Sequence, residues 1–331
     1  MIYRTIGNTD IKASPIGLGT WAIGGGPLWG TTDDAESVRT IHAAIDSGIN
    51  LIDTAPAYGF GRSEEVVGKA IKGRREKLVI STKCGLWWND ARGSFFFEQE
   101  RKKVNRSLRP DTLQIEIEQS LKRLGIDCID IYHTHWQAMP PEKTSIADTM
   151  ACLLKLKAAG KIRSIAVSNA DCAQMDEYRR AGNIAANQPR YSMLDRTIET
   201  ELAPYCLKHN ISLLVYSPLE QGLLTGKIGM DKKIAESEYR NNIAWFKQEN
   251  RRRVLDMLSG WKKLTEQYDC TTAQLVLAWT ISQPGVTAAL CGARHPEQIR
   301  ETAKAGEIFL ADADMRRMRT DVEALGTPGP G

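Results

Sequence analysis

Short apolar runs recur along the chain and alternate with longer stretches in which apolar residues return every three or four positions. Runs of the first kind are typical of parallel strands that are covered on both faces, and the second pattern is typical of helices that bury one side. The predicted strands are residues 15–21, 50–55, 77–83, 128–135, 163–169, 184–190, 211–217 and 286–292. Their alternation with helices predicts the α/β class and a single (β/α)8 TIM barrel.

Capping residues and glycines mark the helix boundaries. Ser63 is expected to cap a helix that carries Glu64 and Glu65 in its first turn, and Asp171 is expected to cap another. Gly125 fits the end of the helix between the third and fourth strands. Further helices are predicted at 197–208, 251–268, 272–282 and 296–305, with an extra terminal helix at 311–325.

Two connections, 84–110 and 221–250, are longer than the others. Both follow a strand, so both are expected at the C-terminal face of the barrel, together with the other functional loops of such a fold. Because no linker or shift in composition divides the chain, residues 1–331 are predicted to form one domain. Residues 326–331 are predicted to form a flexible tail.

Charge and cysteine content narrow the classes of function. The 331 residues include 44 Lys+Arg and 40 Asp+Glu, a formal net charge of +4. This weak balance does not favour binding to nucleic acid or to a membrane surface, and no apolar run is long enough for a membrane span. Seven cysteines without C-x-x-C spacing predict reduced thiols in a cytoplasmic protein. With five histidines in all, no metal site is expected.

Polar residues stand at the carboxyl ends of the apolar strands. Because these ends converge on one pocket in a barrel, their side chains are expected to meet there and to need polar partners. The residues at or next to these ends are Trp21, Asp53, Lys83, His135, Ser168, Asn169, Gln188, Tyr216, Ser217 and Gly292.

Asp53, Lys83 and His135 end successive predicted strands, and Tyr58 lies in the loop after the first of them. A buried lysine needs a carboxylate, which Asp53 offers. The ammonium is expected to lower the pKa of Tyr58 and to make it a general acid near neutral pH. His135 can donate a second hydrogen bond to the same substrate oxygen. Each residue has an ordinary structural explanation on its own, but together the four can polarise and protonate a carbonyl.

Several motifs in this sequence resemble the aldo-keto reductases, in the family's order, from about residue 3 to 325. They are GLGTW (17–21), LIDTAPAYGFGRSEE (51–65), STK (81–83), HTHW (133–136), GKIRSIAVSN (160–169), NQPRYS (187–192), VYSPLEQGLLTGK (215–227) and CGARHPEQIRE (291–301). The likeness is greatest to bacterial NADPH-dependent members that act on glyceraldehyde and other small aldehydes. It implies reduction of small aldehydes, ketones or aldoses by hydride transfer from NADP(H), with NAD(H) as the other cofactor that it allows.

The resemblance also implies roles for single residues. Tyr58 is the proton donor, Lys83 tunes it, Asp53 holds Lys83, and His135 orients the carbonyl oxygen. The residues implied to contact the cofactor are Thr20, Trp21, Asp53, Ser168, Asn169, Gln188 and Tyr216 near the nicotinamide; Ser217, Leu219, Gly222 and Lys227 along the pyrophosphate; and Arg240, Gly292, Arg294, Gln298 and Glu301 at the adenosine phosphate. Arginines suit a 2′-phosphate because they pair with it in a bidentate manner.

The long 84–110 connection is rich in aromatic and basic residues. Aromatic walls with few polar groups suit a partly apolar or sugar-like carbonyl compound, and the residues expected to form them are Trp21, Trp87, Trp88 and Trp136. Lys102, Lys103, Arg106 and Arg109 form a short basic run. A solvated face is the favoured interpretation of this run, although an anionic substrate could exploit it.

The dinucleotide-binding pattern G-x-G-x-x-A is a competing interpretation of the first strand. Gly17, Gly19 and Ala22 match it. The pattern needs a helix that begins at the same turn, and the glycines from Gly24 onward, followed by Pro27, oppose such a helix.

Three alternative functions stay open. His133 and His135 lie on one face of a strand, which is ligand spacing for a metal-dependent barrel hydrolase, although such sites need more ligands than these two. Lys83 could serve as the Schiff-base nucleophile of an aldolase, but Asp53 beside it would raise its pKa. The resemblance also allows a cofactor-binding partner protein with little turnover.

Overall fold

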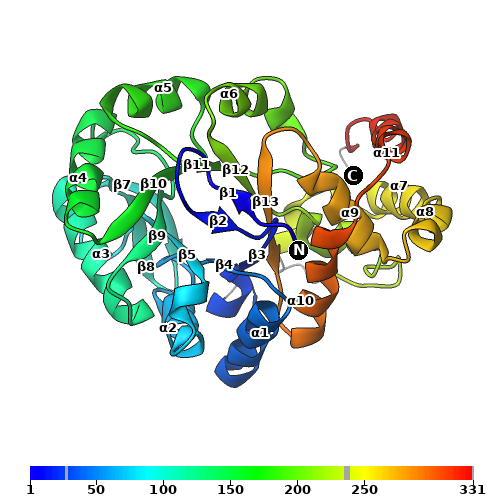
Figure 1. Cartoon of the computed structure of the whole chain (residues 1–331), viewed down its shortest axis with the longest axis horizontal. Coiled ribbons are helices and arrows are strands. Elements are labelled where there is room, and N and C mark those ends of the chain that lie inside the picture. The colour runs from blue at the N-terminus through cyan, green and yellow to red at the C-terminus, as the bar shows by residue number, and fades with distance from the viewer. Residues whose placement is uncertain (27–28, 235–238, 330–331) are drawn as a thin grey trace.

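Eight parallel strands close into a barrel in the computed structural model of the chain, which describes residues 1–26, 29–234 and 239–329 (Figure 1). The barrel strands are β3 (Ile16–Gly19), β4 (Leu51–Asp53), β5 (Val79–Cys84), β9 (Ile129–Thr134), β10 (Ile162–Ser168), β11 (Ala186–Gln188), β12 (Ser212–Tyr216) and β13 (Val286–Gly292). Their order around the barrel is β10, β11, β12, β13, β3, β4, β5 and β9, and β9 pairs with β10. The predicted (β/α)8 barrel is therefore confirmed.

Helices surround the barrel (Figure 1). The helices that follow the first six barrel strands are α1 (Asp34–Asp46), α2 (Arg62–Ile71), α3 (Pro110–Leu124), α4 (Ile146–Ala158), α5 (Cys172–Ala181) and α6 (Leu202–Lys208). After β12 come α7 (Gln248–Ser259), α8 (Lys262–Gln267) and α9 (Thr272–Ile281), and after β13 come α10 (Pro296–Ala303) and α11 (Asp312–Ala324). Short 3-10 turns are η1 (Trp21–Gly24), η2 (Arg75–Lys77), η3 (Thr197–Glu199), η4 (Glu220–Thr225), η5 (Tyr239–Asn242), η6 (Ala244–Phe246) and η7 (Lys304–Glu307).

The inward-facing residues of the strands form an apolar layer below a polar one. Successive side chains of a strand point to opposite faces, so residues two apart share a face. One buried apolar cluster contains Leu51, Val79, Ile131, Ala166, Ala186, Leu214 and Leu290. Two positions further along the same strands stand Asp53, Ser81, His133, Ser168, Gln188, Tyr216 and Gly292. The interior is therefore packed at its N-terminal end and polar at its C-terminal end.

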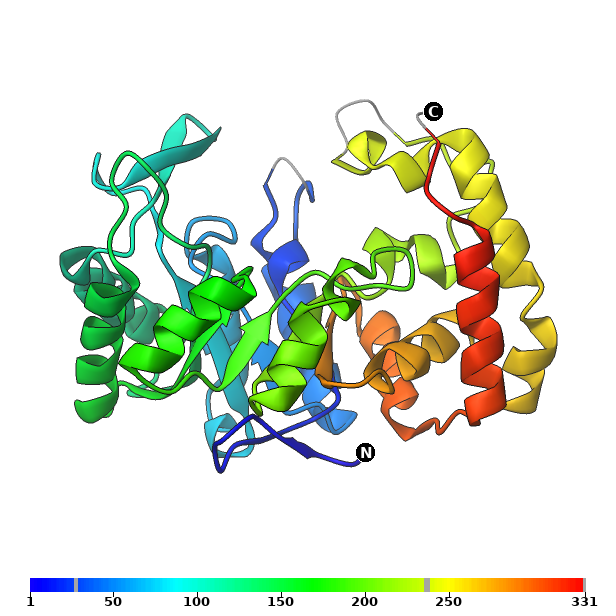
Figure 2. The same ribbon diagram turned by 90° about the horizontal axis from the view of Figure 1, so that it is seen from above.

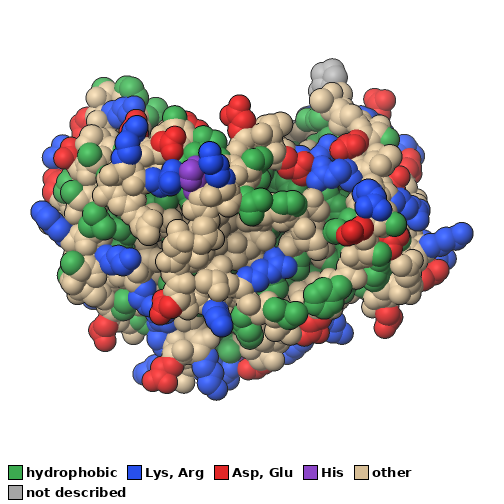
Figure 3. All heavy atoms as spheres, turned by 45° about the horizontal axis from the view of Figure 1, so that its top comes forward, with side chains coloured by type: hydrophobic (Ala, Val, Ile, Leu, Met, Phe, Trp, Pro, Cys, Tyr) green, Lys and Arg blue, Asp and Glu red, His purple; other side chains and the backbone are tan. Residues whose placement is uncertain are grey.

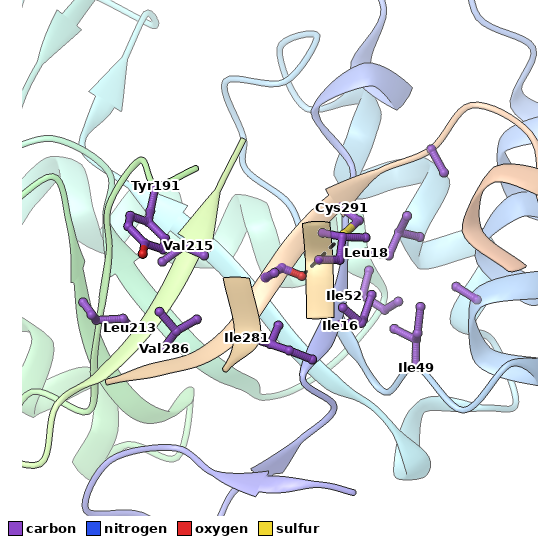
Figure 4. Close-up of a cluster of buried hydrophobic side chains, with 14 of the residues drawn as sticks. Ile16, Leu18, Ile49, Ile52, Tyr191, Leu213, Val215, Ile281, Val286 and Cys291 are labelled. Carbon is purple, nitrogen blue, oxygen red and sulfur yellow. Dashed lines mark hydrogen bonds between the residues drawn. The ribbon is translucent and has the colours of Figure 1, made fainter. Parts of the chain in front are cut away.

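The outward-facing residues make a second, larger core between the barrel and the helices. Figure 4 shows part of it, where Ile16, Leu18 and Ile52 lie near Cys291 and, on the next strands, Leu213 and Val215 lie near Val286. These strands are thus buried on both faces, which explains their nearly continuous apolar sequence.

A short N-terminal hairpin, β1 (Arg4–Thr5) with β2 (Lys12–Ala13), was not predicted. It crosses the N-terminal face of the barrel (Figure 1), and Ile6, Ile11 and Ala13 belong to the apolar cluster of the barrel interior. The hairpin therefore closes the packed end of the barrel and leaves the polar end as the place for a site.

The 84–110 connection contains a small antiparallel sheet of β6 (Leu86–Trp87), β7 (Ser94–Gln99) and β8 (Lys102–Arg106). In Figure 2 this sheet and the segment that contains η5 and η6 both rise from one side of the barrel, opposite the N-terminal hairpin. Both long connections therefore lie at the C-terminal face, as predicted.

Some predicted helix boundaries are wrong. The helix α2 begins at Arg62 with Gly61 before it, and Ser63 lies one residue inside the helix, fully buried, with its hydroxyl 2.7 Å from that of Thr20 and 2.9 Å from that of Thr54. Ser63 thus joins two loops instead of capping a helix. Asp171, in contrast, caps α5 as predicted and accepts a hydrogen bond from the Gln174 backbone at 2.8 Å.

The predicted helix over 251–268 is two helices, α7 and α8. The chain turns at Gly260, and Trp261 is buried there with its indole N–H donated to Asp321 at 2.8 Å. Tertiary packing of one tryptophan therefore ends a helix that the sequence pattern continues.

The tail of the chain is described only up to Gly329. The Gly329 N–H donates to the side-chain oxygen of Asn250 at 3.0 Å, and the Asn250 amide donates to the Gly329 carbonyl at 3.0 Å. Residues 330–331 lie outside the described residues, and flexibility of the tail stays a prediction.

Two global observations bear on partners. In the described parts of the chain, no helix is long and apolar enough to cross a membrane. On the face that Figure 3 shows, basic and acidic side chains are interspersed, without a stripe of one sign.

Candidate active site

A buried ion pair stands at the ends of β4 and β5. Lys83 Nζ donates to Asp53 Oδ2 at 2.7 Å and to the Thr54 carbonyl at 2.9 Å. Burial by itself would lower the pKa of Lys83, but the charge of Asp53 and the hydroxyl of Tyr58 outweigh this and raise it. The lysine is therefore held as an ammonium, as the sequence predicted from the neighbouring carboxylate.

Tyr58 reaches this pair from the loop between β4 and α2. Its hydroxyl lies 3.2 Å from Lys83 Nζ. A side chain at the next residue, Gly59, would come within 2.2 Å of the Gly24 carbonyl oxygen, and Gly59 has a φ of +66°. Only glycine allows the two loops to approach this closely, and this contact fixes the position of Tyr58 over the barrel.

The prediction that the pKa of Tyr58 is lowered is wrong, because the net shift of this pKa is upward. Burial raises the pKa of this phenol most strongly, the charge of Lys83 lowers it, and the charge of Asp53 raises it again, so that the sum is upward. Lys83 thus opposes a larger effect of burial. The phenol stays protonated at neutral pH, which is the form that a proton donor needs.

His135 stands beside Tyr58, directly after β9. Its ring lies edge-on to the phenol with centroids 5.9 Å apart, and its backbone N–H donates to the Cys84 carbonyl at 2.8 Å. Burial, and then the charges of Lys83, His133 and Arg106, lower the pKa of this imidazole well below its usual value. His135 is therefore neutral and can donate one hydrogen bond to an oxygen between it and Tyr58.

Ser81 and His133 support the site from below; Ser81 was not predicted as a site residue, and His133 was considered only as a metal ligand. Ser81 donates to Asp53 Oδ1 at 2.8 Å and lies 3.1 Å from His133 Nε2. The other ring nitrogen of His133 is 3.2 Å from the Val167 carbonyl. The signal was present in the sequence, since Ser81 and His133 stand two residues before Lys83 and His135 and so share their inward faces.

The residues predicted for the nicotinamide form one hydrogen-bonded chain. Tyr216 donates to Asn169 Oδ1 at 3.0 Å, and the Asn169 amide donates to Ser168 Oγ at 3.1 Å. Ser168 donates to the Gln188 carbonyl at 2.8 Å, and the Gln188 amide donates to Asp53 Oδ1 at 2.8 Å. The structure brings these residues together with the buried ion pair, although the link from Gln188 to Asp53 was not predicted.

Thr20 and Trp21 lie on the other side of Tyr58. Thr20 is fully buried and its hydroxyl donates to the Asp53 carbonyl at 2.9 Å, whereas Trp21 is half-buried with its ring centroid 6.3 Å from that of Tyr58. Trp21 therefore stands beside Tyr58, and Thr20 supports the end of β4 through Asp53.

The segment after β12 has an unusual backbone. Ser217, Glu220 and Gln221 have φ values of +58°, +46° and +46°, a region that non-glycine residues rarely adopt, and Gly222 follows at +96°. The side-chain oxygen of Gln221 is buried without a hydrogen-bond partner. Strain and an orphaned acceptor in one loop fit a segment that is shaped to cover a polar ligand, as expected for Ser217, Leu219 and Gly222.

The predicted adenosine end lies at β13 and α10. Arg294 is exposed, and it donates to the Thr31 carbonyl at 2.8 Å while its backbone N–H donates to Gln298 at 2.7 Å. Lys227 pairs with one oxygen of Glu301 at 2.5 Å, and the other oxygen of Glu301 is buried without a partner. The guanidinium carbon of Arg240 lies 5.8 Å from the ring centroid of Phe246.

Gly292 ends β13, and an added side chain there would meet only the Gly19 carbonyl oxygen, at 4.0 Å. With the open space at Gly292, the strained segment and the orphaned acceptors, this edge of the pocket suits a dinucleotide, which brings a phosphate and an adenine amino group.

The sequence matches the model of the aldo/keto reductase family over residues 15–322. The protein belongs to the aldo/keto reductase family. A methylglyoxal reductase of Escherichia coli (strain K12), described as NADH-specific, is 48% identical over 322 residues, which cover 97% of this chain and 98% of the relative.

Two solved structures are similar over nearly the whole chain. A glycerol dehydrogenase from Gluconobacter oxydans has a TM-score of 0.87 and 39% identity, covering 99% of this chain and 97% of that one. An aldo-keto reductase from Klebsiella pneumoniae in complex with NADPH has a TM-score of 0.73 and 28% identity, covering 100% and 98%. This aldo-keto reductase is thus an oxidoreductase that uses a nicotinamide cofactor.

The predicted substrate walls of this aldo-keto reductase are only partly gathered at the pocket. Trp136 lies directly after His135 and beside Phe96, with ring centroids 5.6 Å apart. Trp87 is buried and donates its indole N–H to Asp90 at 2.7 Å. Trp88 lines a separate groove of about 690 Å³ between α2 and α3. Substrate contact by Trp87 and Trp88 stays a prediction.

The hydrolase and aldolase alternatives find little support in the structure. Both ring nitrogens of His133 lie within hydrogen-bond distance of protein oxygens, and the described residues hold no group of three or more His, Cys, Asp or Glu side chains that could bind a metal ion. Lys83 Nζ has three acceptors, which favour its charged form over a nucleophilic amine.

Proposed function

We propose that this enzyme reduces the carbonyl group of small aldehydes, ketones or aldoses, with Tyr58 as the proton donor and with NADPH bound more tightly than NADH. The observation that carries the proposal is the contact of the Tyr58 hydroxyl with an ammonium, Lys83, which is itself locked to Asp53 at 2.7 Å. The proton donor, its tuning cation and the neutral His135 lie together at the C-terminal end of the barrel.

Asp53, Tyr58, Lys83 and His135 each have a separate role in the reaction. A nicotinamide cofactor, when bound, supplies the hydride. Tyr58 holds the proton that the new alkoxide takes, and Lys83 stabilises the phenolate that remains. His135 donates a hydrogen bond to the carbonyl oxygen and orients it. Asp53 accepts hydrogen bonds from Ser81, Lys83 and Gln188, so its charge and position are fixed before substrate arrives.

The preference for NADPH is supported by Arg294. No carboxylate among the described residues pairs with its guanidinium, which is bonded to the Thr31 carbonyl instead and so keeps its charge available to a 2′-phosphate. The printed name of the E. coli relative points the other way, toward NADH. The ratio of the two dissociation constants in the unmutated protein decides between them, and equal constants would refute the proposed preference.

The substrate class is consistent with the relatives, which are named for methylglyoxal and glycerol. The test is the rate of NADPH and NADH oxidation over a panel of aldehydes, ketones and aldoses, with Tyr58→Phe as the control. Turnover of any of them by the wild-type protein, absent from Tyr58→Phe, would support the proposal. It would also exclude a role as a cofactor-binding partner without turnover.

The same assay addresses two remaining predictions. Prolonged chelation should leave the rate unchanged, whereas loss of activity would revive the metal-dependent hydrolase. All seven cysteines are free in the structure, and thiol titration of the unfolded protein without reductant should find all seven. The cytoplasmic location stays a prediction that rests on these thiols.

A further inference from the structure

Arg106, the last residue of β8, lies against two aromatic rings that also contact each other. Its guanidinium carbon lies 3.9 Å from the ring centroid of Phe96 and 4.7 Å from that of Trp136. A solvated basic face was the favoured interpretation of the run that contains Arg106, and for this residue it holds only for the terminal nitrogens, since Nε is buried. The planar group packs in the corner that the two rings form, because aromatic faces attract a guanidinium by cation–π interaction and stacking.

The charge of Arg106 has no counter-ion among the described residues. Its Nε is enclosed without a hydrogen-bond acceptor, and the two terminal nitrogens donate to no described group while remaining open to solvent. Burial lowers the pKa of this guanidinium. The neighbouring arginines differ, since Arg92 pairs with Asp90 at 2.7 Å and Arg109 pairs with Asp111 at 3.1 Å. An arginine that is partly enclosed and left unpaired is costly unless something else uses its charge.

Arg106 lies on the substrate side of the pocket. Trp136, one of its two aromatic neighbours, directly follows His135, and the charge of Arg106 is among those that lower the pKa of the His135 imidazole, after burial, Lys83 and His133. His135 follows β9, which pairs with β5 and β10, while the residues predicted for the pyrophosphate and the adenosine phosphate end or follow β12 or β13. The guanidinium is thus beside the carbonyl site and on a different part of the rim from the predicted adenosine end.

We propose that Arg106 is a specificity-determining residue that binds an anionic group, a carboxylate or a phosphate, on the carbonyl substrate. The inference rests on the proposed carbonyl reduction and names a substrate class for it. Contact with the two rings restricts the guanidinium and leaves its terminal N–H groups open for a bidentate contact. These terminal groups are the donors that an oxyanion can reach, because Nε is buried.

The test compares substrates that differ in charge at nearly constant size. The pairs are 4-oxobutanoate against butanal, for a carboxylate, and glyceraldehyde 3-phosphate against glyceraldehyde, for a phosphate. For each, kcat/KM is measured in the wild type, Arg106→Met, Arg106→Lys and Lys103→Met. Met keeps an apolar side chain against the two rings, Lys keeps the charge without the planar fork, and Lys103 is an exposed cation on the same strand.

The wild type is expected to prefer the anionic member of at least one pair, and that pair identifies the anion. Arg106→Met should lower kcat/KM for the anionic substrate by about 10-fold to 100-fold, as for the loss of a hydrogen bond to a charged group, and leave the neutral substrate within about twofold, the range of a near-neutral surface change. Arg106→Lys should fall between the two. Lys103→Met should match the wild type on all four substrates.

Two results would overturn the inference. One is an equal loss of kcat/KM on neutral and anionic substrates in Arg106→Met, which would give the residue a purely structural role. The other is the absence of any preference of the wild type for either anionic substrate. Binding of the same compounds to protein loaded with oxidised cofactor, measured by calorimetry, separates this inference from the proposed function. Selective binding of the anion that Arg106→Met abolishes would support the inference even if no substrate were turned over.

Discussion

Two lysine–carboxylate pairs lie at opposite ends of the predicted cofactor site and differ mainly in burial. Lys83 and Asp53 are 2.7 Å apart, and their side chains are 1% and 4% exposed. Lys227 and Glu301 are 2.5 Å apart, and theirs are 64% and 20% exposed. The geometry of the two contacts is nearly the same, so distance alone cannot tell which of them matters.

The surroundings of each pair decide how much it contributes. Asp53 also accepts from Ser81 and Gln188, and Lys83 also donates to the Thr54 carbonyl, so that loss of either partner strands a charge in the barrel. Water can replace the contact between Lys227 and one oxygen of Glu301 at little cost in free energy, and salt screens the two charges. The barrel thus preorganises the chemical end of the site, whereas the adenosine end is an adjustable surface.

The largest contrast is expected in stability. Lys83→Met leaves Asp53 buried without its cation and should lower the free energy of unfolding by about 3–5 kcal/mol, measured by urea denaturation. The double variant Lys83→Met/Asp53→Asn should lose less than the sum of the single variants, because the two residues act as a unit. Additive losses would mean that the pair is not coupled.

At the same buried end, Tyr58→Phe keeps the ring and removes the transferable proton. The rate of carbonyl reduction should fall by about 10²-fold or more, as for loss of a general acid, while the dissociation constant of the cofactor changes little. Turnover and cofactor titration by fluorescence check the two halves of this expectation. A variant that turns over near the wild-type rate would remove Tyr58 from the mechanism.

The pH profile reports how Lys83 acts on Tyr58. Because the pKa of Tyr58 is raised above its usual value of 10.0, the donor stays protonated and the reduction rate should decline only above about pH 10. Lys83 is a charge that lowers this pKa, so any activity left in Lys83→Met should decline at a still higher pH. Lys227→Met serves as the control, and the pH above which its rate declines should be the same as in the wild type.

A smaller effect is expected from Arg294 at the exposed end. Arg294→Met should weaken NADPH binding by about tenfold or more, as for a lost hydrogen bond to a charged group, and should leave NADH binding almost unchanged. Added salt should weaken NADPH more than NADH in the wild type and less so in the variant. Equal losses for both cofactors would show that Arg294 holds the Thr31 loop and does not read the phosphate.

The smallest effect is expected when the exposed pair itself is broken. Lys227→Met should change the free energy of unfolding by about 0.2–1 kcal/mol, as for other exposed ion pairs, and raised salt should remove the difference. A loss comparable to that of Lys83→Met would show that contact distance, and not burial, sets the value of such pairs in this protein.

Much of the site could be predicted because, in a barrel, the place of a residue along its strand determines how near it lies to the C-terminal rim. A polar residue that ends an apolar strand must lie at one rim, and so Asp53, Lys83 and His135 were found without a structure. Ser81 and His133 obey the same period of two, but they lie two residues before the strand ends, where a polar side chain also fits ordinary packing of the barrel interior. Arg106 had no such rule, since a residue of an irregular connection takes its place from the aromatic rings that it meets.

The pattern along the chain determines the order of the strands, their inward faces and the residues at one rim. It does so because strands alternate with helices, side chains alternate along each strand, and the connections between parallel strands have one hand. Other facts depend on distances that no local pattern encodes. Burial, and not the neighbouring Lys83, set the direction of the Tyr58 pKa; contacts across loops placed Ser63 between Thr20 and Thr54; and packing of Trp261 divided a helix. In each case the deciding free energy is desolvation or close packing, which exists only once distant segments have met.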